Sequence, residues 1–117
     1  MKIQVSFHGL PDREPVEREL RRQGARLEKR LGKFAPDLVD LHVSLARRAR
    51  RGEPVVASLS LYLPPGQLHA REEASLAVVA LKHACAELLR ELEPFQAKLR
   101  GEDKLRRWRR RARRPPA

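Results

Sequence analysis

The stretch that decides the fold is EASLAVVALKHACAELLRELEPFQAKL, residues 73–99. Its apolar side chains recur at alternating intervals of three and four, namely at Val78, Leu81, Cys85, Leu88, Leu92, Phe95 and Leu99. Because side chains at this interval return to one face of an α-helix, they form a single apolar stripe. The pattern predicts a long amphipathic helix that Pro94 kinks or ends near Leu92, since proline lacks an N–H and its ring clashes with the preceding turn. The remaining segments must cover this stripe.

Apolar and polar side chains alternate in four other places, which is the pattern of half-buried strands. The alternation predicts strands at residues 3–7, 39–45, 57–63 and 67–71. The third and fourth strands are separated by Pro64-Pro65-Gly66, which predicts a turn.

A first helix is expected from about Pro15 to residue 31. Asp12 or Glu14 is the candidate N-cap, and proline suits a first helical turn because its missing N–H would be unpaired there. Gly24 falls on the apolar face of this helix, where a close approach to the sheet would favour glycine. Gly32 is the candidate stop.

The order of elements is therefore β-α-β-β-β-α, in an α+β domain of about 100 residues. One four-stranded mixed sheet with both helices packed on one face buries every apolar face. The first two strands should be parallel, joined by a right-handed crossover, and the last two strands should be antiparallel additions. We expect residues 1–100 to form this domain and residues 101–117 to form a basic tail that is largely unstructured.

The chain carries 26 Lys and Arg against 15 Asp and Glu, a net charge of +11. Residues 101–117 hold 8 basic and 2 acidic side chains, so about half of the excess lies in the tail. This balance indicates a polyanionic partner, and nucleic acid is favoured over membrane because Leu105 and Trp108 are the tail's only large apolar groups. No apolar run is long enough to cross a membrane, no signal peptide is evident, and the single cysteine, Cys85, suits a buried position in a reducing compartment. We expect a cytoplasmic protein.

Basic residues gather on one side of the first helix. Arg18, Arg22, Arg26, Lys29 and Lys33 fall within about 80° of arc at 100° per residue. The stripe has two interpretations: it is a solvated helix face, or it is a ladder of cations that follows a phosphate backbone. Four further arginines crowd residues 47–51, in the loop before the third strand.

The tail has two interpretations as well. Its arginines can bind phosphates while Trp108 stacks on a base. It can equally be a solubilising extension, or a sequence that another factor recognises.

No enzyme is predicted. The sequence has no phosphate-binding glycine loop, no nucleophile elbow and no metal-ligand spacing of cysteine or histidine. His8, His42 and His69 all fall on the polar face of the sheet, but the first and last strands are opposite edges, too far apart to share an ion. The sheet lacks the paired aromatics on which RNA-binding sheets stack bases, since Tyr62 is its only outward ring, so RNA binding through the sheet is not expected.

Three runs resemble the ribosome hibernation promoting factor family, also called ribosome-associated inhibitor A or sigma-54 modulation proteins. They are KIQVSF at the start, ARLEKRL in the first helix, and LHAREEASLAVVALKHACAELLRELEPFQAKLR, which matches the family's fourth strand and long helix without a gap. The chain looks like a short, divergent member over residues 2–100. We therefore expect no separate C-terminal dimerisation domain of the kind that long members have.

The resemblance implies a fold like that of double-stranded-RNA-binding domains. It also implies a monomer off the ribosome that binds small-subunit rRNA in the channel between head and body, occludes the tRNA and mRNA sites and silences translation under stress. The matching basic positions are Arg26, Arg90, Lys98 and Arg100. The chain departs from the family at Leu76, Val78 and Lys82, where members have Asp, Tyr and Asp, and at Glu87 and Glu93, where members are usually basic.

The alternative function is a general RNA- or DNA-binding accessory protein that acts through its tail. We expect no cofactor, metal, membrane or small-molecule substrate. The residues expected to contact RNA are Arg18, Arg22, Arg26, Lys29, Lys33, Arg47, Arg48, Arg50, Arg51, Arg90, Lys98, Arg100, Lys104, Arg106, Arg107, Trp108, Arg109 and Arg110.

Overall fold

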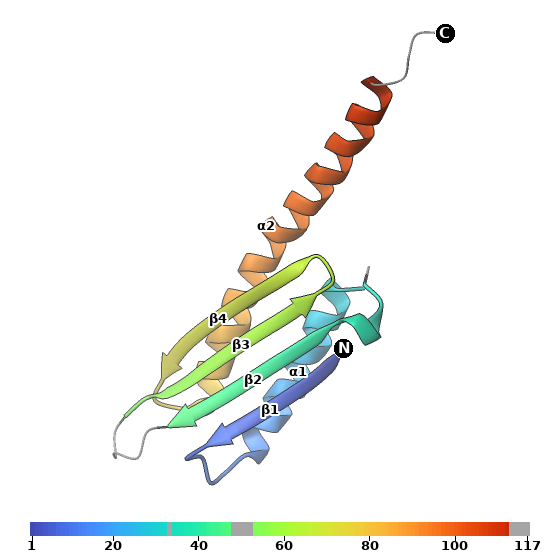
Figure 1. Cartoon of the computed structure of the whole chain (residues 1–117). Coiled ribbons are helices and arrows are strands. Elements are labelled where there is room, and N and C mark those ends of the chain that lie inside the picture. Colours follow the sequence, from blue (N-terminus) through green and yellow to red (C-terminus); the bar gives the residue numbers. More distant parts are fainter. Residues whose placement is uncertain (33, 48–52, 113–117) are drawn as a thin grey trace.

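A computed structural model describes the backbone of residues 1–32, 34–47 and 53–112, and the side chains of these residues as far as position 98. The predicted order of elements is confirmed (Figure 1). The elements are β1 (Lys2–His8), α1 (Glu14–Arg30), the short 3-10 helix η1 (Pro36–Leu38), β2 (Asp40–Arg47), β3 (Val55–Leu63), β4 (Gly66–Ala74) and α2 (Ala77–Ala112).

The four strands form one sheet in the order β1-β2-β3-β4. β1 pairs with β2 in parallel, whereas β2–β3 and β3–β4 are antiparallel pairs. The turn at Pro64 and Pro65 brings Leu63 opposite Gly66. The predicted mixed topology is therefore confirmed.

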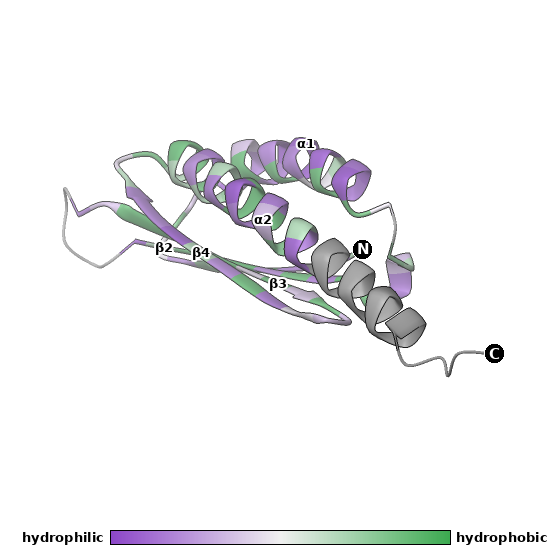
Figure 2. Ribbon diagram, turned by 90° about the horizontal axis from the view of Figure 1, so that it is seen from above, coloured by the Kyte–Doolittle hydropathy of each residue, from purple (hydrophilic) through white to green (hydrophobic). Residues whose placement is uncertain are grey.

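Both helices lie on the same face of the sheet, and the other face is left open (Figure 2). The core between the two layers is aliphatic, because the inward positions of the strands and helices are mainly leucine and valine. β3 alternates strictly between buried and half-buried residues along its whole length. The largest fully buried side chains include Leu27, Leu41, Leu45, Leu59, Leu61, Leu81, Leu88 and Leu92. The two predicted apolar helix faces are thus packed against one sheet.

α2 begins at Ala77, four residues later than the pattern predicted. Its first expected residues instead extend β4, which pairs with β3 as far as the Val55–Ala74 pair. Glu72 takes a half-buried position on the helix side of this edge strand, so a polar residue conceals the alternation there. The backbone hydrogen bonds of β3 are satisfied by this longer partner.

Pro94 does not end α2, which continues past the end of the sheet to Ala112 (Figure 1). Two contacts hold the helix just after the proline. A Cβ built at Gly66 would lie 3.3 Å from Cε2 of Phe95, so this ring packs against the β3–β4 turn. Gln96 Nε2 donates a hydrogen bond to the backbone oxygen of Arg30, 3.0 Å away. Of the two effects predicted for Pro94, a kink or an end, the end is wrong, and the backbone of residues 101–112, expected to be largely unstructured, is helical.

The first helix is not capped as expected. Its N-cap is Arg13, with no side-chain cap hydrogen bond, although Pro15 does lie in the first turn. The helix ends at Arg30, two residues before Gly32. Gly24 is buried where α1 crosses the edge of the sheet, since an added Cβ would lie 3.2 Å from Cδ1 of Ile3. This close approach was predicted.

Gly9 ends β1 with a left-handed backbone, φ +68°. A Cβ at this position would lie only 2.5 Å from the backbone oxygen of Arg47, at the end of β2. Both facts require glycine at this corner of the sheet.

Candidate nucleic-acid interface

The basic stripe of α1 is exposed on the outer side of the helical layer. Arg18, Arg22, Arg26 and Lys29 all reach solvent, and Lys33 lies outside the described residues. We call the first four residues the α1 stripe. At 1.5 Å per residue it spans about 17 Å of helix. None of its members is needed for the core, so the structure leaves them available to a partner.

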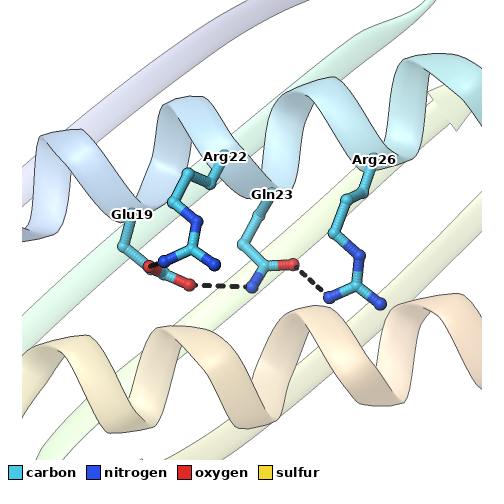
Figure 3. Close-up of polar contacts among 4 residues, drawn as sticks. All are labelled: Glu19, Arg22, Gln23 and Arg26. Carbon is cyan, nitrogen blue, oxygen red and sulfur yellow. Dashed lines mark hydrogen bonds and ion pairs between the residues drawn. The ribbon is translucent and has the colours of Figure 1, made fainter.

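Two buried polar side chains lie beneath this stripe, facing α2 (Figure 3). Glu19 and Gln23 are only 6% and 7% exposed, and Gln23 Nε2 donates to Glu19 Oε1 over 2.9 Å. The Glu19 carboxylate also lies 3.6 Å from Nη1 of Arg22, and Gln23 Oε1 accepts from Nη1 of Arg26 over 3.4 Å. The pair therefore holds two arginines of the α1 stripe on the side of α1 that faces α2. This role of Glu19 and Gln23 was not predicted from the sequence.

A shallow hollow of about 230 Å³ lies between the two helices. Its lining is Arg26, Lys29 and Arg30 from α1, with Leu89 from α2. Arg30 was not predicted as a site residue, because it falls about 40° beyond the stripe at 100° per residue. The position of α2 brings it to the same hollow. Three cations around one small depression can hold a phosphate oxygen from more than one side.

Cys85 lies in the core beneath these groups and is fully buried. Burial raises the pKa of its thiol, the Glu19 carboxylate adds to this rise and Arg26 opposes it, so that the pKa is about 12. The thiol is therefore protonated at neutral pH and is not a nucleophile. This agrees with its expected structural role.

The outer face of α2 carries little net charge. Arg90, 78% exposed on its side chain, lies 3.4 Å from the carboxylate of Glu87. Lys82, Glu93 and Lys98 are exposed on the same helix. Of the described α2 residues, only Arg90 and Lys98 belong to the predicted RNA-binding set, and Arg90 is paired with a carboxylate, as Arg22 is with Glu19.

Arg47 ties parts of the fold together. It ends β2, and its Nη2 donates to the backbone oxygen of Ser75 over 3.1 Å, in the connection between β4 and α2. Its side chain is only half exposed, unlike those of the α1 stripe. Arg48, Arg50 and Arg51 lie outside the described residues, as do the side chains of Arg100, Lys104, Arg106, Arg107, Trp108, Arg109 and Arg110.

Metal ligands do not gather among the residues that the structure describes: no group of three His, Cys, Asp or Glu side chains could hold an ion there. Nor is any helix within the described ranges long and apolar enough to cross a bilayer. The α1 stripe and the hollow beside it bring several exposed cations together.

Solved structures show the same fold. The N-terminal domain of protein Y from Thermus thermophilus matches with a TM-score of 0.66 at 20% identity, over 81% of this chain and 99% of that one. A ribosomal subunit interface protein from Coxiella burnetii matches with a TM-score of 0.57 at 22% identity, over 83% of this chain and 99% of that one. No family model matches the chain, and no curated protein is significantly similar in sequence. The fold implied by the sequence resemblance is therefore confirmed.

Proposed function

We propose that this protein is a ribosome-associated translation inhibitor of the hibernation promoting factor type, which acts in the cytoplasm by binding small-subunit rRNA. The observation that carries the proposal is the α1 stripe, with Arg22 and Arg26 held by the buried Glu19–Gln23 pair. The fold supports it, because a protein named for the ribosomal subunit interface has the same fold over nearly its whole length. The three sequence runs supply the family resemblance.

The α1 stripe is suited to a phosphate backbone rather than to individual bases. Its cations follow one another along a rigid helix, and the hollow offers a place where one phosphate meets two of them, Arg26 and Lys29, together with Arg30. Contacts of this kind position a protein on RNA and depend strongly on salt, since each neutralised phosphate releases counterions. With about six phosphates neutralised, raising salt from 50 to 200 mM should weaken binding by roughly a thousandfold.

The contribution of α2 to RNA binding is smaller in this proposal than the family resemblance implies. Glu87 beside Arg90 and the exposed Glu93 leave the outer face of α2 nearly neutral. The charge that this face lacks is abundant in residues 101–117. In the proposed complex, α1 faces rRNA, the domain occludes the tRNA and mRNA sites in the channel between head and body, and the basic tail follows mRNA or rRNA.

A second candidate function is general binding of RNA or DNA through the tail alone. It is favoured by one observation, the 8 basic residues among the last 17. Under this alternative, the α1 stripe is a solvated helix face.

Co-sedimentation of the purified chain with separated ribosomal subunits tests the proposal. We expect the full chain to sediment with small subunits, and a chain ending at residue 100 to bind them more weakly but at the same place, as mapped by crosslinking. Binding that vanishes with the tail would favour the second candidate. Stable association with large subunits alone would refute the proposed function.

A further inference from the structure

The open face of the sheet carries an ordered array of polar side chains. Strand register places Gln4, His42, Ser60 and His69 in one row across the four strands, and Lys2, Asp40, Tyr62 and Gln67 in the neighbouring row. This face lies on the opposite side of the sheet from both helices (Figure 2). It is therefore separate from the α1 stripe.

Three aromatic rings meet on this face. The ring centroids of His42 and Tyr62 are 4.9 Å apart, and those of Tyr62 and His69 are 6.3 Å apart, both edge to face. His69 Nδ1 lies 2.9 Å from Oγ of Ser60, which fixes the imidazole over the middle of β3. Both histidines are exposed and Tyr62 is half-buried. We call His42, Tyr62 and His69 the ring cluster.

RNA binding through the sheet was not expected from the sequence, because Tyr62 was counted as a single outward ring. The ring cluster adds two imidazoles to that ring. Diagonal neighbours on adjacent strands lie within reach of aromatic side chains, so the register converts scattered residues into one surface. Several of the other side chains on this face are small, with serine at positions 6, 44, 58 and 60. The rings are therefore larger than these neighbours.

The charge of this face is balanced. Lys2 is in the same row as Asp40, and Arg71 lies 3.9 Å from Glu73. Such a face offers little to phosphates, in contrast to the α1 stripe. What it offers is two exposed imidazoles and a half-buried tyrosine ring with hydroxyl and amide groups beside them, which suits a flat, uncharged, aromatic group.

We propose that the ring cluster stacks unpaired bases of single-stranded RNA. Tyrosine and histidine rings are common platforms for splayed-out bases, and Ser60, Gln4 and Gln67 provide donors and acceptors for base edges. The inference rests on the proposed function in taking RNA as the partner, and it adds the class of RNA, a segment with free bases. The protein would thus hold RNA on two opposite surfaces, by phosphates at α1 and by bases at the sheet.

Fluorescence anisotropy with two labelled 12-nucleotide RNAs tests this inference on the full chain. One RNA is oligo(A) and the other has the same backbone with abasic positions. We expect the double variant His42→Ala/Tyr62→Ala to bind oligo(A) about tenfold or more weakly, since stacking contributes about 1–3 kcal/mol per base. Its affinity for the abasic RNA should not change.

Two further variants serve as controls. His42→Phe/Tyr62→Phe keeps both ring faces and should retain most of the affinity for oligo(A), whereas Ser44→Ala, on the same face without a ring, should have no effect. Stacking also quenches 2-aminopurine in the oligonucleotide. Because Trp108 of the tail can itself stack on a base, the quenching is measured with Trp108→Ala, a substitution outside the sheet domain, and should persist.

The outcomes separate this inference from the proposed function. Arg22→Ala/Arg26→Ala should lower the affinity for both RNAs by the same factor. If the affinity for both RNAs is unchanged in this variant, the result counts against the α1 stripe and not against the ring cluster. Equal affinity of the ring variant and the wild-type chain for oligo(A), or an absence of 2-aminopurine quenching, would overturn the stacking inference. A ring variant that loses ribosome binding but binds both RNAs normally would also overturn it, because the face would then recognise protein.

Discussion

Replacing Gly9 with alanine should be among the most damaging single-methyl changes in the molecule. Gly9 has φ +68°, a conformation that costs a residue with a Cβ roughly 1–2 kcal/mol. The new Cβ would also lie 2.5 Å from the backbone oxygen of Arg47. Backbone must move to relieve that contact, because neither partner is a flexible side chain.

The same movement affects a second contact. The guanidinium of Arg47 donates to the backbone oxygen of Ser75 and ties β2 to the start of α2. The added methyl group requires either that Arg47 shifts, which strains this hydrogen bond, or that the corner at the end of β1 deforms. The backbone cost and the strained contact together should lower the free energy of unfolding of Gly9→Ala by about 2–4 kcal/mol. This is a large share of the roughly 5–15 kcal/mol by which folded domains are typically stable.

Gly32→Ala is the matched control. Its added Cβ would have an ordinary contact of 3.7 Å with the backbone oxygen of Lys29, and its φ is not positive. We expect it to be neutral or stabilising by a few tenths of a kcal/mol, since alanine reduces the freedom of the unfolded chain. Urea unfolding followed by far-UV circular dichroism measures both variants. Free energies of unfolding within about 0.5 kcal/mol of each other, the usual scatter of neutral substitutions, would show that position 9 does not require glycine.

Two further predictions concern α2. The pKa of Cys85 is raised from 9.0 to about 12, so the folded chain keeps a thiol proton that the unfolded chain releases above pH 9. The stability that this proton contributes is complete below pH 9 and is lost as the pH rises toward 12, by up to about 1.4 kcal/mol per pH unit. The difference in urea midpoint between wild type and Cys85→Ala should therefore shrink from about pH 7 to about pH 10.5, and a constant difference would contradict it. Pro94→Ala restores an N–H that can donate to the backbone oxygen of Arg90, so it should raise the free energy of unfolding by about 1–3 kcal/mol. Glu93→Ala, at an exposed position, is its control. If Pro94→Ala has the same free energy of unfolding as this control, the helix beyond Pro94 unfolds separately.

The arrangement of elements could be predicted because most of them carry a regular apolar pattern. Leu81, Cys85, Leu88 and Leu92 mark one helix face, and the strict alternation of β3 marks a strand packed on one side. Where a polar residue takes an inward position, the pattern fails. Glu72 conceals the end of β4, and so the start of α2 was placed four residues too early.

The candidate sites depend on tertiary structure to a greater degree. The α1 stripe followed from helical geometry alone, and its described members are exposed as expected. The burial of Glu19 and Gln23 could not be deduced in this way, because it depends on where α2 packs against α1. The ring cluster depends on the register among three strands, which the pattern of a single strand does not determine.

In the proposed function, the α1 stripe contacts phosphates of rRNA. Two double variants remove the same charge from exposed positions: Arg22→Ala/Arg26→Ala within the stripe, and Arg21→Ala/Lys82→Ala outside it. Each lost phosphate contact should reduce the slope of log K against log salt by about 0.9. At about 100 mM salt, two lost contacts correspond to a loss of affinity of roughly 50- to 100-fold.

The most direct test is therefore the salt dependence of binding to isolated small ribosomal subunits, measured by co-sedimentation between about 50 and 200 mM salt. We predict that the slope falls by nearly two for Arg22→Ala/Arg26→Ala and stays close to that of the wild-type chain for Arg21→Ala/Lys82→Ala. Equal slopes for the two double variants would contradict the claim, since the α1 stripe would then contribute only its share of the net charge.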